Sequence, residues 1–274
     1  LAVSWLGQNN IETDYIKEPY PDLYYYLAGS LDSDLTWLSD YIKAYRRSKI
    51  ANAISDDVMR VINEKNKNHA SFNNWYNSFK TTKTVLNSRE DVEVFYWIDG
   101  LGVEWIPYIS WLLNRKEGVY LNEIHIARAS YPTTTANNKI SLEDLSHNSL
   151  KKIGDLDDHA HQNANKYPEY LIEEFKIVKD AISKIISEYA GKKIAIVSDH
   201  GITAMSQYCN GLNLVGYKSD HGGRLAVKES GKPNTDDNYV VCEDDRTICA
   251  LKHNSLCGKI PAGQSAHGGC TPEE

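Results

Sequence analysis

Hydrophobic residues recur every three or four positions between residues 34 and 80, which is the spacing of amphipathic helices. The positions that set this spacing are Leu35, Leu38, Ile42, Tyr45, Val58, Val61 and Ile62. Ser55 precedes the second group and belongs to a residue type that caps helices, so a separate helix is expected to begin there. We find no catalytic constellation in this part of the chain. Residues 1–88 are therefore interpreted as a helical N-terminal region with a structural or partner-binding role.

The pattern changes near residue 92. Residues 92–98 alternate and are rich in β-branched and aromatic side chains, and residues 194–197 form an apolar run, so both segments predict strands. Residues 119–127 predict a further strand, and a long amphipathic helix is expected over residues 168–190. Alternating strands and helices are typical of an α/β fold. We therefore expect residues 89–274 to form one domain with a central, mostly parallel sheet flanked by helices.

Two further elements complete this pattern. Trp105, Ile109 and Leu112 share a helical face after the first strand, and Pro107 is tolerated in the first turn of that helix. Residues 239–251 read as shorter strands, which we place at a sheet edge.

Composition excludes several classes of protein. No run approaches the roughly 18 uninterrupted apolar residues of a membrane span. The net charge is −7 and the sequence shows no basic stripe, so extensive binding to duplex nucleic acid is not expected. A small phosphate substrate is disfavoured less by this charge. The five cysteines are odd in number and lack close pairs, as expected for reduced thiols. We expect a cytoplasmic protein without a membrane partner.

Acidic residues stand where two predicted strands end. Asp99 follows the first strand, and the glycines of Gly100-Leu101-Gly102 allow the backbone to turn sharply beside a metal or a phosphate. Asp199 and His200 follow the strand over residues 194–197. Ligands of α/β sheets bind at the carboxyl ends of the strands. Asp99, Asp199 and His200 are therefore candidate metal ligands.

The densest group of potential ligands lies between residues 155 and 161. Asp155 and His159 are four residues apart, and so are Asp157 and His161. On a helix either pair shares one face and can hold a single ion. Oxygen and imidazole ligands suit zinc and admit manganese.

Three further segments carry candidate chemistry. Thr133, Thr134 and Thr135 offer hydroxyl groups, which become nucleophiles only when a base or a metal activates them. His267 precedes two glycines that permit close backbone approach. A second Asp-His pair at residues 220–221 follows a weaker strand. We assign His221 and Arg224 to substrate binding, with a surface role as the alternative, because a guanidinium suits phosphate oxygens.

Taken together, these residues resemble the alkaline phosphatase superfamily, and most closely its PglZ-domain branch. The superfamily order is a strand-end Asp, a Thr or Ser nucleophile, an Asp with a His four residues later, an Asp-His pair and a late His. Here the order falls on Asp99, Thr135, Asp157, His161, Asp199, His200 and His267. The segments that look most like PglZ are Ile98–Trp105 and the final His-Gly-Gly-x-Thr-Pro-Glu-Glu.

The resemblance implies an alkaline-phosphatase-like fold and a metal-dependent phosphodiesterase or phosphatase. One divalent ion, zinc or else manganese, would bind Asp157, His161 and His267. A second ion would bind Asp99, Asp199 and His200, with Thr135 facing it as the nucleophile and Thr134 as the second choice.

The resemblance also implies a biological setting. The substrate would be a nucleotide or oligonucleotide phosphoester, and the setting a bacterial phage-defence system of the BREX type, with its protein partners, or a signalling system. Two alternatives stay open. One is a phosphomonoesterase or phosphomutase of the same superfamily, and the other is a non-catalytic interaction module of a defence complex.

Overall fold

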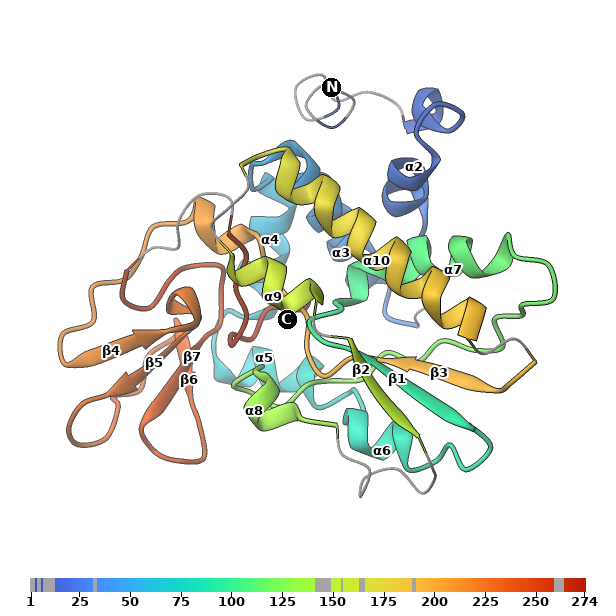
Figure 1. Cartoon of the computed structure of the whole chain (residues 1–274). Coiled ribbons are helices and arrows are strands. Elements are labelled where there is room, and N and C mark those ends of the chain that lie inside the picture. The colour runs from blue at the N-terminus through green and yellow to red at the C-terminus, as the bar shows by residue number, and fades with distance from the viewer. Residues whose placement is uncertain are drawn as a thin grey trace.

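The computed structural model describes residues 3, 6, 13–31, 34–140, 149–153, 155–162, 166–188, 191–258 and 264–274. The chain forms an α/β structure with a helical N-terminal region, a three-stranded parallel sheet and a four-stranded antiparallel sheet (Figure 1). In the view of Figure 1 the antiparallel sheet lies on the left and the parallel sheet on the right, and the C-terminus lies between them beside α9. None of the helices in the described ranges combines the length and hydrophobicity of a membrane span.

The N-terminal region is helical, as the hydrophobic spacing predicts. Its helices are α2 (Pro21–Ala28), α3 (Thr36–Ala51), α4 (Asp56–Lys65), α5 (His69–Tyr76) and α6 (Thr82–Leu86). The Ser55 side chain accepts a hydrogen bond from the Val58 N–H and caps α4, so the helix start expected there is confirmed.

The parallel sheet has the order β2-β1-β3. Its strands are β1 (Val94–Ile98), β2 (Leu150–Ile153) and β3 (Ile194–Val197). The helices of this half are α7 (Ile106–Asn114), α8 (Thr135–Asn138), α9 (Asp155–His161) and α10 (Glu169–Glu188). The sequence predicts β1, β3, α7 and α10, and the structure confirms these four elements.

The strand predicted over residues 119–127 is wrong. This segment has no strand in the structure, and Tyr120 is 84% exposed. Both edges of β1 are instead paired with β2 and β3. Strand β2 has only four residues, and two of these are lysines, so its hydrophobic signal in the sequence is weak.

The C-terminal third forms a sheet of its own rather than an edge of the parallel sheet. Its strands are β4 (Tyr217–Asp220), β5 (Leu225–Lys228), β6 (Tyr239–Val241) and β7 (Thr247–Ala250), in the antiparallel order β4-β5-β7-β6. The strands expected over residues 239–251 are therefore present. β7 pairs with both β5 and β6, so of these two strands β6 lies at an edge of the antiparallel sheet.

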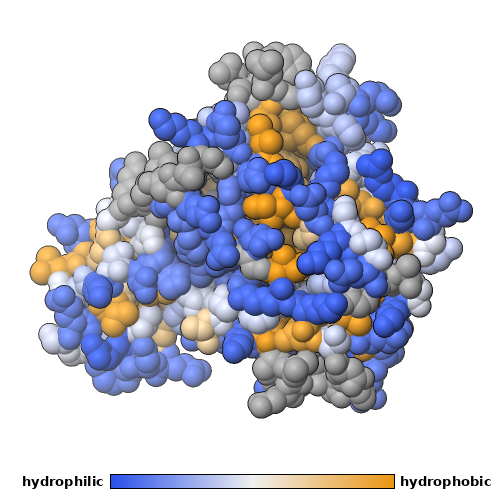
Figure 2. All heavy atoms as spheres, viewed as in Figure 1, coloured by the Kyte–Doolittle hydropathy of each residue, from blue (hydrophilic) through white to orange (hydrophobic). Residues whose placement is uncertain are grey.

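Both faces of β1 are buried. Val94, Tyr96 and Ile98 pack on one face in a core that includes side chains of α2, α7 and α10, whereas Phe95 and Trp97 pack on the other face. Figure 1 shows α7 and α10 crossing one face of this sheet and α6 lying below the other. Helix α10 is amphipathic, and hydrophilic residues predominate on the molecular face in Figure 2. The burial of both faces of β1 explains why this strand is a continuous run of hydrophobic residues.

The helical region packs directly against the later part of the chain. Tyr41 and Ile62, from α3 and α4, share a core with Met205, and Phe72 of α5 shares one with Leu225 and Cys249. The domain boundary between residues 88 and 89 stays a prediction.

Candidate metal centre

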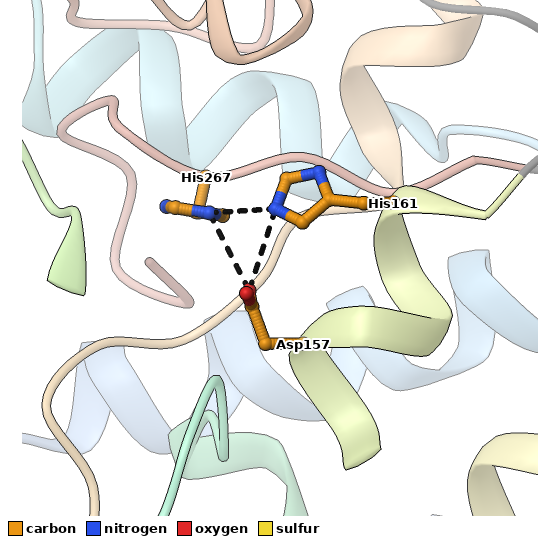
Figure 3. Close-up of side chains that lie close together, drawn as sticks. All are labelled: Asp157, His161 and His267. Carbon is orange, nitrogen blue, oxygen red and sulfur yellow. Dashed lines mark hydrogen bonds and ion pairs between the residues drawn. The ribbon is translucent and has the colours of Figure 1, made fainter. Parts of the chain in front are cut away.

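The first ligand group consists of Asp157, His161 and His267 (Figure 3). Helix α9 presents Asp157 and His161 from one face, as their four-residue spacing predicts, and the C-terminal segment brings in His267. The Nε2 atoms of the two histidines lie 2.9 Å apart, and Asp157 Oδ1 lies 3.5 Å from that of His161 and 3.4 Å from that of His267. Ligands at about 2.0–2.1 Å in a tetrahedron are about 3.4 Å apart, so these atoms can surround one zinc ion.

The predicted second ligand group, Asp99, Asp199 and His200, lies at the ends of β1 and β3, but among the described residues it is Asp157, not Asp199, that completes a set of mutually close ligand atoms with Asp99 and His200. His200 Nε2 lies 3.4 Å from Asp99 Oδ1 and 3.5 Å from Asp199 Oδ2. The Thr135 hydroxyl donates a hydrogen bond of 3.1 Å to Asp99 Oδ1 and lies 3.1 Å from His200 Nε2. The separation of Asp99 and His200 matches two ligands of one small cation, whereas Asp199 lies beside His200 outside the groups of mutually close ligand atoms.

The two groups are neighbours. The ligand atoms of Asp99, Asp157 and His200 all lie within 4.8 Å of one another, so Asp157 touches both groups. The rings of His200 and His267 stack with their centroids 4.1 Å apart. The arrangement therefore offers two adjacent cation positions that share a carboxylate between them.

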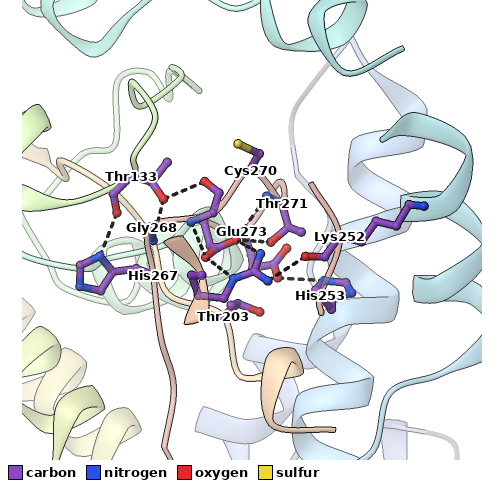
Figure 4. A network of polar contacts seen from close by, with 12 residues as sticks. Thr133, Thr203, Lys252, His253, His267, Gly268, Cys270, Thr271 and Glu273 are labelled. Atoms are coloured by element: carbon purple, nitrogen blue, oxygen red, sulfur yellow. Dashed lines mark hydrogen bonds and ion pairs between the residues drawn. The ribbon is translucent and has the colours of Figure 1, made fainter. Parts of the chain in front are cut away.

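Backbone carbonyl groups orient the two buried histidines. His267 Nδ1 lies 2.8 Å from the Thr133 carbonyl oxygen (Figure 4), and His200 Nδ1 lies 3.0 Å from that of Gly201. Since a carbonyl only accepts, Nδ1 carries the proton in each ring, and each Nε2 lone pair is left for a ligand. This is how metal-binding histidines are commonly held.

Burial shapes the protonation of these ligands. Burial, together with the charge of His200, lowers the pKa of His267 to about 3, so the imidazole is neutral and can bind a cation at neutral pH. Burial also raises the pKa of Asp199. The contact with the Asp157 carboxylate raises the pKa of His161. Burial favours a higher pKa for Asp157, but the nearby imidazoles outweigh it and lower the pKa of that carboxyl.

Two carboxylate oxygens in the groups have no hydrogen bond. Asp157 Oδ1 and Asp199 Oδ2 are buried and accept none from the described residues. A buried carboxylate oxygen without a donor costs free energy unless a cation compensates it. The residues present therefore fit divalent ions, and the donor set of carboxylate oxygens and imidazole nitrogens suits zinc or manganese.

The alternative ligand pair points elsewhere. His159 Nε2 lies 3.0 Å from the Tyr170 carbonyl oxygen of α10, and Asp155 is exposed on the outer side of α9. Neither residue belongs to a ligand group among the described residues. The structure thus separates the two pairs that the sequence leaves equivalent.

The three threonines also have different surroundings. Thr135 begins α8 and faces the second ligand group, as described above. The Thr133 hydroxyl donates to the Gly269 carbonyl and accepts from the Gly268 N–H, so it holds the segment around His267. Thr134 is buried, and its side chain does not cap α8.

His221 lies beside the first ligand group. Its ring centroid is 4.7 Å from that of His267 and 6.3 Å from that of His161. Its backbone adopts φ 46°, a left-handed conformation that is uncommon for a residue with a side chain. His221 therefore lies beside candidate metal ligands, and the role in substrate binding expected for it stays a prediction.

The position expected for Arg224 requires a correction. Its side chain has no exposed surface and forms an ion pair with Glu274, while Nη1 donates to the carbonyls of Lys252 and Asn254. The guanidinium is thus neither on the surface nor directed to the ligand groups. The sequence suggested a phosphate contact because a guanidinium suits phosphate oxygens, but Arg224 directly precedes β5, which begins with buried residues, and is itself buried.

Two residues of the site escape the sequence reasoning. Trp97 Nε1 donates a hydrogen bond of 2.9 Å to Asp199 Oδ1 and orients that carboxylate. Lys152 Nζ lies 2.5 Å from Asp99 Oδ2. Residues 150–153 read Leu-Lys-Lys-Ile and give no alternating signal for a strand, whereas the parallel register places Lys152 on the same side of the sheet as Trp97.

Comparison with models of known protein families gives no match for this chain, and no curated protein matches it.

Proposed function

We propose that the chain is a metal-dependent phosphodiesterase or phosphatase that acts on nucleotide or oligonucleotide phosphoesters. The position of the Thr135 hydroxyl carries this proposal. It lies 3.1 Å from both Asp99 Oδ1 and His200 Nε2, next to two groups of atoms spaced as metal ligands. A hydroxyl is a weak nucleophile by itself, and a neighbouring cation is one of the means that activate it.

The ligand groups would supply the metal chemistry. Two divalent ions, zinc or manganese, would lower the pKa of the hydroxyl and offset the negative charge of the phosphoryl oxygens. Asp157, His161 and His267 would hold one ion, and Asp99, Asp199 and His200 the other.

The chain's own contribution is a two-stage displacement at phosphorus. In the first stage Thr135 Oγ1 bonds to phosphorus while the bond to the leaving alcohol breaks, and in the second stage water releases the phosphate from Thr135. Buried His200 and His267 direct their Nε2 atoms at the site, because the carbonyls of Gly201 and Thr133 hold the opposite nitrogens of their rings. Preorganised ligands of this kind need no rearrangement during the reaction.

The order of the site residues along the chain supports the same proposal, because it resembles the alkaline phosphatase superfamily and its PglZ branch. A role in bacterial phage defence or signalling follows from that resemblance alone. Only 21 residues separate Thr135 from Asp157, which leaves little room for the cap that a phosphomutase needs to enclose its substrate.

Hydrolysis of bis-p-nitrophenyl phosphate with added zinc or manganese tests the proposal, and p-nitrophenyl phosphate separates diesterase from monoesterase activity. Thr135→Ala and His267→Ala should abolish turnover, whereas the matched variant His159→Ala should retain it. Metal analysis of the purified protein distinguishes an enzyme, which should hold about two ions per chain, from an interaction module, which should hold none. Full activity in Thr135→Ala would show that the assigned site is wrong.

A further inference from the structure

Lys152 is a cation at the edge of the second ligand group. It stands on β2 opposite Trp97 of β1 in the parallel register, and its ammonium lies 4.4 Å from the centroid of the Trp97 ring. From there Nζ reaches Asp99 Oδ2 at 2.5 Å. The aromatic face and the carboxylate together fix where this long side chain ends.

The ammonium and the Thr135 hydroxyl share one carboxylate. Thr135 Oγ1 donates to Asp99 Oδ1, and Lys152 Nζ contacts Oδ2 of the same residue. Because both contacts fall on one carboxylate, the Thr135 hydroxyl and the Lys152 ammonium border the same part of the site. An ammonium has three N–H donors, and the contact with Asp99 occupies one of them.

The Lys152 side chain is open to an incoming ligand. It is 44% exposed, whereas that of Asp99 is 5% exposed. The ligand groups contribute three carboxylates, and the guanidinium of Arg224 is bound to Glu274 in the core. Lys152 therefore supplies, beside the ligand groups, the positive side chain that the sequence analysis expected from Arg224.

We propose that Lys152 binds a phosphoryl oxygen of the substrate at the Thr135 end of the site. This inference rests on the proposed function and assigns to Lys152 the phosphate contact that Arg224 does not make. Lysine commonly binds phosphate as a point charge. The contact between Lys152 and the phosphoryl oxygen would replace the ion pair between Lys152 and Asp99 when a divalent ion binds the Asp99 carboxylate.

The experiment measures binding of inorganic phosphate to the zinc-loaded protein by calorimetry, with metal content determined on the same samples. Lys152→Met should weaken phosphate binding about 10- to 100-fold, as expected for loss of a hydrogen bond to a charged group. It should raise KM for bis-p-nitrophenyl phosphate without lowering metal content, and Lys152→Arg should restore most of the binding. The matched control is Lys151→Met, because Lys151 pairs with Glu188 at 3.2 Å on the opposite side of β2.

The outcomes separate this inference from the proposed function. A wild-type protein that binds neither divalent ions nor phosphate overturns both. If wild type binds both and Lys152→Met binds phosphate equally well, the inference alone is overturned. A variant that only gains affinity for the second ion also overturns it, since Lys152 would then serve as a counter-ion for Asp99.

Discussion

Arg224 and Glu274 form an ion pair in which neither side chain has exposed surface. Arg224 Nε and Nη2 donate to the two carboxylate oxygens of Glu274 at 2.9 and 2.6 Å. The same carboxylate accepts from the N–H of Gly269 and from the hydroxyl of Thr271. The pair thereby fixes the turn that follows His267, so a core interaction determines the position of a candidate metal ligand.

Removal of the arginine should therefore destabilise the protein strongly. Arg224→Met leaves the Glu274 carboxylate buried without its partner, and the expected loss is about 3–5 kcal/mol of unfolding free energy. Urea denaturation in the presence of a chelator measures it. Lys232→Met is the matched control, because Lys232 pairs with Asp245 on the surface and its loss should cost about 1 kcal/mol or less. Equal losses in the two variants would contradict a structural role for Arg224.

Helix α9 should bind metal through one face only. His161→Ala removes a ligand of the first group and should lower zinc content by about one ion per chain, since three protein ligands become two. His159→Ala should keep the wild-type content, because His159 Nε2 contacts the carbonyl of Tyr170. Elemental analysis of dialysed protein measures both. Loss of zinc in His159→Ala with retention in His161→Ala would instead assign the ion to Asp155 and His159.

The threonine triplet should divide by position. Thr135→Ala should abolish measurable turnover of bis-p-nitrophenyl phosphate, because removal of a catalytic nucleophile costs on the order of 10⁶ in kcat. Thr134→Ala should leave the rate within a few-fold, since Thr135 is the hydroxyl that contacts Asp99 and His200. Steady-state rates at matched metal content test this. A larger loss in Thr134→Ala would move the nucleophile by one residue.

Local patterns in the sequence identify most of the helices and the strands β1 and β3, of which β1 is buried throughout. They narrow the candidate ligands of α9 to two pairs, because a four-residue spacing places each pair on one face of a helix. Strand β2 is missed because its four residues, Leu-Lys-Lys-Ile, show neither alternation nor a hydrophobic run, and Lys152 is missed with it. The burial of Arg224 depends on Glu274, which lies 50 residues later, so no local pattern reports it. Long-range pairing decides these positions.

Glu273 should make stability depend on acid pH. Glu273 is buried, and burial alone would raise its pKa. The charge of His253 and the hydrogen bonds from His253 and Tyr41 outweigh burial and lower the pKa of Glu273 from 4.5 to about 2. A depressed carboxyl pKa stabilises the fold above pH 4.5, and the stabilisation is lost as pH falls towards 2. Between pH 6 and pH 3 the wild type should lose about 2 kcal/mol more unfolding free energy than Glu273→Gln, which cannot ionise. Urea titrations of both proteins in chelator, so that metal release does not contribute, measure this difference, and parallel pH dependences would refute the assigned role of Glu273.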